Sequence, residues 1–307
     1  MKKSVRSLFL VFISMMVVTG ALLATACTSN TPSQESQPTS TSTKPTGSLV
    51  LSVSFARNSL DPQNSSPNTF QALGAIFDSL IELTPEGKAI PGIAERWEIS
   101  ADGKSHTFYI RKGVKFQDGS DLTGADVKFS LERMVIKTSL HTDLAVWQRL
   151  LSSVELKDDY TVVMHLTQPL YELMLGIDAP SGAGAVIPKK YFEEKGLDYF
   201  TTHPMGSGPW KLVKWEAGIR LELEAYEDHW SGAPKLKNVT LLNVTDEATR
   251  VAMLKTGEVD LAEVAPDSVA GLKAAGLKIV SHDGGSQVMA HMWYDPANPQ
   301  NWATGHA

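Results

Sequence analysis

Large apolar residues alternate with smaller or polar ones in several short stretches of the chain, and this spacing predicts β-strands. The first stretch is SLVLSVSF, residues 48–55. Three later stretches each hold two strand-like runs around a short turn, which is typical of hairpins. These hairpins are expected over residues 99–111, 154–166 and 210–226, with turns at Asp102–Gly103, Asp158–Asp159 and residues 216–218.

Apolar residues three and four positions apart predict helices between these strands. Residues 68–83 show this spacing throughout. Residues 122–134 begin with Thr123 and Asp126, close to a capping box. Residues 246–264 predict a helix that a glycine stops, followed by a short strand. Because helices and strands are interleaved, we expect an α/β fold with a mixed sheet.

The N-terminus has the pattern of an export signal. Three cationic residues precede an apolar run from Leu8 to about Leu23. This order, with small residues after it, is typical of a secretory signal peptide, here over residues 1–26. The run is also about as long as a short membrane span, so an uncleaved anchor is the alternative. The sequence ATAC, residues 24–27, resembles the lipobox of bacterial lipoproteins, whereas ordinary cleavage after Ala26 would also give export.

Cys27 is the one cysteine of the chain. An exported protein with one cysteine forms no internal disulfide, and lipidation would consume the free thiol. Residues 28–47 contain no large apolar side chain, so residues 27–47 are expected to be a lipidated cysteine and a flexible tether. We therefore expect the chain to be exported and held by a lipid anchor on the extracytoplasmic face of the membrane, in the periplasm or at the cell surface.

Charge and motifs exclude several classes of function. A net charge of −6 does not suggest a nucleic-acid partner. No protease, hydrolase or nucleotide-binding motif occurs, and MGSGPW, residues 205–210, precedes a predicted strand, which favours a tight turn over a phosphate loop. The eight histidines are scattered, without the spacing of a helical metal site. We expect no catalysis, no cofactor and no metal.

Several longer segments resemble one family when they are taken in order. They are SLDPQ, FDSLIEL, PGIAERWEISADGKSHTFYIRKGVKFQDGSDLTGADVKFSLERM, HPMGSGPWKLVKWEAG and DHWSGAPKLKNVTLLNVTDEATRVAMLKTGEVDLAEV. The chain is similar here to the family 5 extracellular solute-binding proteins, the dipeptide, oligopeptide and nickel-type receptors of ABC importers. The resemblance covers about residues 48–264. Gln117 stands where the family usually has His, and Ser207 where it usually has Thr.

The resemblance implies a periplasmic-binding-protein-like (type II) fold. Residues 48–92 and 204–307 would form an incomplete first lobe with a mixed sheet, and residues 93–203 a small inserted α+β subdomain. Family members continue into a second lobe, which this chain would lack. The implied function is a substrate-binding lipoprotein that captures peptides or similar small solutes and delivers them to an ABC permease in the inner membrane. The alternative is a truncated receptor that acts as a surface interaction module without transport.

The resemblance also suggests ligand-binding residues. The loop at residues 63–70 would face the cleft, with Ser65 and Ser66 offering hydroxyl and backbone groups and Phe70 an apolar wall. Trp147 lies where nickel-type relatives place a cleft tryptophan. The alternatives are that the serines only form a turn, and that Phe70 and Trp147 are ordinary core residues. Peptide is the expected ligand, while nickel chelates, sugars and other solutes stay open.

Overall fold

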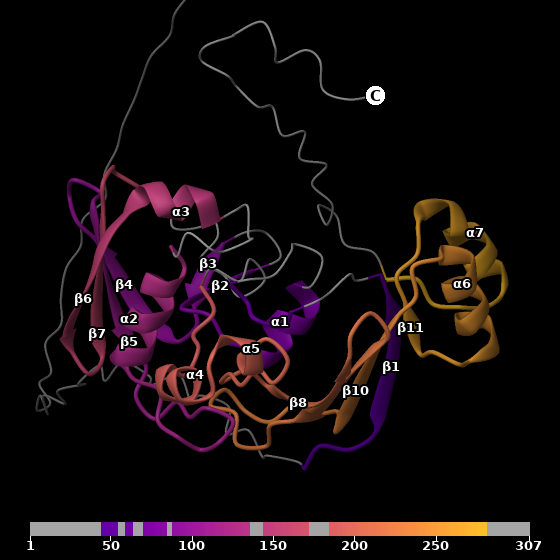
Figure 1. Cartoon of the computed structure of the whole chain (residues 1–307). Coiled ribbons are helices and arrows are strands. Elements are labelled where there is room, and N and C mark those ends of the chain that lie inside the picture. The colour runs from indigo at the N-terminus through magenta and orange to yellow at the C-terminus, as the bar shows by residue number, and fades with distance from the viewer. Residues whose placement is uncertain are drawn as a thin grey trace, which may run out of the picture. The chain divides into compact units, whose positions relative to one another are not determined.

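The computed structural model of the chain describes residues 44–54, 59–63, 70–84, 88–135, 144–171 and 184–280. Its larger sheet has five strands in the order β11-β1-β10-β9-β8 (Figure 1). The strands are β1 (Ser48–Val53), β8 (Trp210–Glu216), β9 (Arg220–Ala225), β10 (Asn238–Asn243) and β11 (Leu261–Ala262). β1 is parallel to β10 and β11, whereas β9 is antiparallel to β8 and β10. The predicted mixed sheet is confirmed.

A second sheet of four antiparallel strands has the order β4-β5-β7-β6. Its strands are β4 (Ala94–Ile99), β5 (Ser105–Ile110), β6 (Leu151–Asp158) and β7 (Thr161–Leu166). Gly103 adopts a φ of 68° in the β4–β5 turn, a conformation that glycine takes without steric cost. All three predicted hairpins are confirmed, since β8 and β9 form the third.

The helices of the described residues are α1 (Phe70–Ile76), α2 (Gly124–Arg133), α3 (Leu144–Leu150), α4 (Lys189–Lys195), α5 (Leu197–Phe200), α6 (Glu247–Thr256) and α7 (Pro266–Ala274). Local sequence signals set the ends of two of them, α2 and α6, which the sequence predicts. The Thr123 amide at the start of α2 donates to Asp126 Oδ2 over 3.0 Å. α6 begins after Asp246 and ends at Gly257, which has a φ of 75°. The predicted helices after residues 122 and 246 are therefore confirmed.

The prediction of one helix over residues 68–83 is wrong in its second half. α1 ends at Ile76, and Ile81–Leu83 form a short strand, β2, that pairs with β3 (Ala89–Pro91). Residues 76 to 81 are buried one after another, so this segment has no solvent-facing stripe. Burial of every successive residue, including the polar Asp78 and Ser79, fits an extended segment, and the helical spacing of the apolar residues was not decisive.

Two hydrophobic clusters stabilise the sheets. One is formed by the four-stranded sheet and α2, and in it Phe108, Val127 and Met164 are each 0% exposed. The other lies between α1 and the five-stranded sheet and includes Leu73 and Leu221. The larger sheet thus takes its strands from both sides of the segment that forms the smaller sheet, while the domain boundaries at residues 93 and 203 stay a prediction. No helix in the described part of the chain could span a membrane.

Candidate functional site

A buried ion pair holds the beginning of the loop that is predicted to face the ligand. Arg133, the last residue of α2, donates through Nη1 to Asp61 Oδ1 over 2.9 Å and through Nη2 to Asp61 Oδ2. The Asp61 and Arg133 side chains are 0% and 8% exposed. Two parallel hydrogen bonds from a planar guanidinium fix both the distance and the orientation of a carboxylate. The pair therefore ties the chain before the loop rigidly to α2.

Gln63, the first residue of the loop, is part of the same network. Arg133 Nη1 also donates to Gln63 Oε1 over 2.9 Å, and Gln63 Nε2 donates to the Ser130 carbonyl over 2.7 Å. The guanidinium carbon lies 4.3 Å from the centre of the Phe192 ring. Both carboxylate oxygens of Asp61, both terminal nitrogens of Arg133 and both polar side-chain atoms of Gln63 thus have a hydrogen-bond partner, as a buried polar network requires.

The predicted ligand-binding residues fall in different places. Ser65, Ser66 and Cys27 lie outside the described residues. Phe70 begins α1, and its side chain is outside the described part. Trp147 lies on α3 with 2% of its side chain exposed, packed into the core of the four-stranded sheet. This burial agrees with the core alternative, and the ligand-binding role of these residues stays a prediction.

The glycine-rich segment before β8 crosses directly over the end of α1. A Cβ atom on Gly206 would lie 2.2 Å from the Ile76 carbonyl oxygen, and one on Gly208 would lie 2.6 Å from the Ile76 carbonyl carbon. The Gln117 amide nitrogen lies 3.1, 3.0 and 2.8 Å from the carbonyl oxygens of Ile76, Gly208 and Trp210. The segment is a close backbone crossing, as expected, and Gln117 fastens it.

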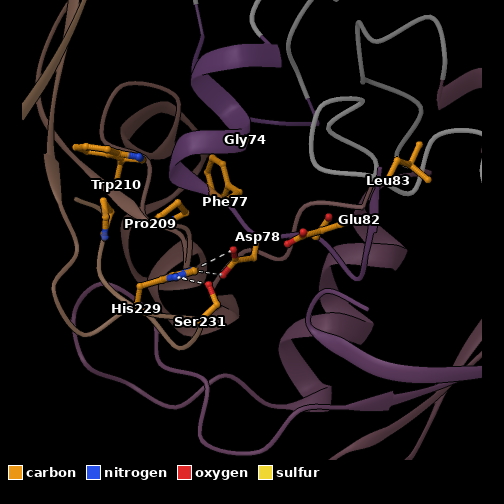
Figure 2. Close-up of a pocket in the computed structure, with 12 residues that line it drawn as sticks. Gly74, Phe77, Asp78, Glu82, Leu83, Pro209, Trp210, His229 and Ser231 are labelled. Carbon is orange, nitrogen blue, oxygen red and sulfur yellow. Dashed lines mark hydrogen bonds and ion pairs between the residues drawn. The ribbon is translucent and has the colours of Figure 1, made fainter. Parts of the chain in front are cut away.

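A cavity of about 450 Å³ opens beside this crossing (Figure 2). It lies at the C-terminal end of α1, between that helix, β2 and the loop between β9 and β10. Its apolar wall contains Phe77, Leu83, Pro209, Trp210 and Pro234. Its polar side contains Asp78, Glu82, His229 and Ser231.

Asp78 is the centre of the polar side. Its side chain is 6% exposed and accepts a hydrogen bond at Oδ2 from Trp230 Nε1 over 2.9 Å. His229 Nε2 lies 3.3 Å from Asp78 Oδ1, and Ser231 Oγ lies 3.0 Å from His229 Nδ1. Figure 2 shows the His229 ring beside both the carboxylate and the hydroxyl. Each of the two ring nitrogens thus has one of these groups as its partner.

Glu82 has a perturbed titration in this setting. Burial, and next the negative charge of Asp78, raise the pKa of Glu82, while His229 and Arg111 act in the opposite direction. Two carboxylates therefore face the same region of the cavity. Among the described residues, no group of three or more His, Cys, Asp or Glu side chains could hold a metal ion.

Comparison with known proteins assigns the chain to a family. The model of a family described as "Bacterial extracellular solute-binding proteins, family 5 Middle" matches residues 88–300. The chain belongs to this family. The resemblance found in the sequence is confirmed, and the family consists of extracellular solute-binding proteins rather than enzymes.

Curated members of family 5 are longer than this chain. The glutathione-binding protein GsiB of Salmonella choleraesuis is 32% identical over 228 residues, which are 74% of this chain and 44% of that protein. GsiB of Escherichia coli O157:H7 is 31% identical over 229 residues, 73% of this chain and 43% of its own length. The chain thus spans less than half the length of these family 5 relatives.

Solved family 5 structures have the same fold. The periplasmic binding protein DppA from Helicobacter pylori, in complex with the peptide STSA, matches with a TM-score of 0.66 and 25% identity over 74% of this chain and 49% of that one. AgaA from A. tumefacien R10, in complex with agropinic acid, matches with a TM-score of 0.66 and 30% identity over 74% of this chain and 46% of that one. The predicted periplasmic-binding-protein-like α/β fold is confirmed.

Reasoning from the sequence did not identify the residues around the cavity. Asp78 and His229 are 151 positions apart. Both lie in segments that resemble family 5, FDSLIEL and DHWSGAP, but no local pattern brings these segments together. The contact joins the segment after α1 to the loop between β9 and β10.

Proposed function

We propose that this chain captures peptides or similar small solutes outside the cytoplasm and delivers them to an ABC permease in the inner membrane. The observation that carries the proposal is the family 5 match over residues 88–300, together with a fold shared with peptide-bound DppA. Other solutes fit the same scaffold, since GsiB is a glutathione-binding protein and AgaA was solved with agropinic acid. We expect no catalytic turnover of the solute.

The ligand site that we propose is the loop at residues 63–70, with Ser65, Ser66 and Phe70 as contacts. The buried Asp61–Arg133 pair supports it, because a binding loop is effective when a rigid scaffold positions it. Extended peptides are often bound through main-chain hydrogen bonds, to which backbone groups and hydroxyls of such a loop are suited.

Thermal unfolding with added ligand tests this site. Glutathione, dipeptides and longer peptides are added to the purified full chain, and a ligand that binds is expected to raise Tm. At a hundred-fold excess over Kd, the free energy of unfolding rises by about 2.7 kcal/mol. A Ser65→Ala, Ser66→Ala double variant should reduce the shift, whereas Ser153→Ala, on the exposed surface of β6, should not. The absence of a shift with every peptide would count against the proposal.

We further propose that Cys27 carries the lipid anchor after removal of residues 1–26. The lipobox-like sequence and the single cysteine support this. More than one acyl chain is needed for stable attachment to a membrane. In the protein from the membrane fraction, the mature chain should begin at Cys27 and its N-terminal peptide should carry acyl chains by mass spectrometry, and Cys27→Ser should move the chain out of that fraction. An unmodified Cys27 in the membrane-bound protein would refute the anchor.

A further inference from the structure

None of the residues that line the cavity beside Asp78 belongs to the proposed peptide loop at residues 63–70. The loop precedes the N-terminus of α1, whereas the cavity lies at the other end of that helix (Figure 2). A helix of seven residues is about 10 Å long. The cavity also has a volume within the range of small-molecule sites, about 300–1,000 Å³. It can therefore be considered as a site of its own.

The polar side of the cavity holds two carboxylates, Asp78 and Glu82. The Asp78 carboxylate contacts the indole of Trp230 and the ring of His229. Ser231 Oγ contacts the other ring nitrogen of His229. The indole and the imidazole thus fix the position of the buried Asp78 carboxylate.

Glu82 adds a second negative charge. Among the described residues, it takes part in no ion pair. Arg111 acts on it from a distance, and the Arg111 guanidinium lies over the Trp230 ring, 4.6 Å from its centre. Glu82 is therefore the carboxylate of the cavity without a counter-ion at ion-pair distance in the described part of the chain, and a cationic ligand can supply one.

The apolar wall of the cavity indicates which chemical group should be joined to the positive charge of the ligand. Phe77, Leu83 and Trp210 line the cavity with apolar surface. Removing an apolar group from water against such a wall is favourable, and aromatic faces also attract ammonium groups. Figure 2 shows Phe77 and Trp210 across the cavity from Glu82.

We propose that this cavity binds a small organic cation, a primary ammonium joined to a compact apolar group. The ammonium contacts the Asp78 and Glu82 carboxylates, and the apolar group packs on Phe77 and Trp210. A free amine and the amino terminus of a peptide share this chemistry. The residues of this site differ from those of the proposed peptide loop.

Isothermal titration of the full chain at pH 7 with 2-phenylethylamine tests the proposal. The matched neutral ligand is 2-phenylethanol, which has the same apolar group without the charge. We expect saturable binding of the amine and at least about a ten-fold weaker interaction with the alcohol. Equal binding of the two ligands, or no saturable binding of the amine, would overturn the proposal.

Glu82→Gln locates the binding. Glu82 is accessible to solvent on β2, although neighbouring groups desolvate part of its carboxylate, so the variant should keep its fold, which a thermal melt verifies. The affinity for the amine should fall about ten-fold. Glu95→Gln, an equal charge change on an exposed residue of β4 outside the cavity, should leave it unchanged. An unchanged affinity in Glu82→Gln would place the amine elsewhere and refute the site.

The dipeptide Phe-Gly distinguishes the two sources of the ammonium group. If the cavity receives peptide amino termini, Glu82→Gln weakens Phe-Gly binding and N-acetylation abolishes the part that depends on Glu82. If it receives free amines alone, 2-phenylethylamine depends on Glu82 while Phe-Gly does not. Either pattern supports the cation site, and a dependence of neither ligand on Glu82 overturns it. Peptide binding that is insensitive to Glu82 leaves the proposed function untouched.

Discussion

Two aspartates, Asp61 and Asp78, are buried in this molecule in opposite ways. Asp61 is 0% exposed, and a bidentate arginine contacts both of its oxygens. Asp78 is 6% exposed, is held by an indole and an imidazole, and faces a cavity together with Glu82. One carboxylate is paired with an arginine inside the fold, whereas the other is held by two aromatic side chains at the edge of a cavity.

The difference indicates what each residue does. A buried pair with complete hydrogen bonding orders the chain around it, and little capacity remains for a ligand. A fixed carboxylate beside a second one, next to open volume, can gain from a ligand of opposite charge. We infer that Asp61 is a structural residue below the peptide loop, and that Asp78 belongs to a binding surface.

The largest effect on stability is expected when the Asp61–Arg133 pair is broken. Arg133→Met leaves the Asp61 carboxylate buried without its counter-charge, and we expect a loss of about 3–5 kcal/mol in the free energy of unfolding. Urea denaturation measures this loss. Arg96→Met breaks an exposed pair with Glu98 and should leave stability essentially unchanged. Equal effects of the two variants would show that burial does not distinguish the pairs.

A smaller effect is expected from moving the backbone crossing that forms one side of the cavity. Gly206→Ala places a Cβ 2.2 Å from the Ile76 carbonyl oxygen, so the backbone must shift, at a cost of about 3 kcal/mol. Gly271→Ala, within α7 and with open space around it, should instead stabilise by roughly 0.5–1 kcal/mol. Thermal melts of the two variants should change in opposite directions. A change in the same direction would contradict the close crossing.

Trp230→Phe removes the indole that holds Asp78. The lost hydrogen bond to a buried carboxylate should reduce the free energy of unfolding by about 2 kcal/mol. Trp215→Phe is the matched control, because the Trp215 Nε1 atom has no hydrogen-bond partner among the described residues. Chemical denaturation should show the larger loss for Trp230→Phe. The reverse order would mean that the indole does not position Asp78.

The smallest effect concerns the charge of Glu82. Its raised pKa means that the folded state binds the proton more tightly than the unfolded state, for which 4.5 is the ordinary value. Stability should therefore fall as the pH rises above 4.5 through the folded-state pKa. Glu82→Gln should melt slightly higher than the unmodified chain at pH 7, and the difference should vanish below pH 4.5. A lower Tm for Glu82→Gln at pH 7 would contradict repulsion by Asp78.

Features with a local cause could be predicted from the sequence. The Asp102–Gly103 turn and the Thr123–Asp126 cap depend on neighbouring residues, and the hairpin and the helix formed where expected. The segment after Ile76 could not be predicted, because its partners, Ala89–Pro91 for β2 and Ala185 for Ser79, do not appear in its own pattern.

The candidate sites show the same division. The resemblance pointed to the loop at residues 63–70, but only the structure shows that Arg133, 72 positions from Asp61, holds the chain before that loop. The contact between Asp78 and His229 depends on the path of the whole chain between them. Neither contact has a short-range signature, so periodicity and motif spacing could not have found them.

The strand order also affects how the chain folds during synthesis. Ser48 of β1 is paired with Asn238 of β10, whereas the four strands of the smaller sheet all lie between residues 94 and 166. At about 5–20 residues per second, β1 is made roughly 10–40 s before its partner. The smaller sheet can close during that interval, and the larger one cannot. A newly made chain is thus expected to pass through a state in which the smaller sheet is folded while the first strand of the larger sheet is still unpaired.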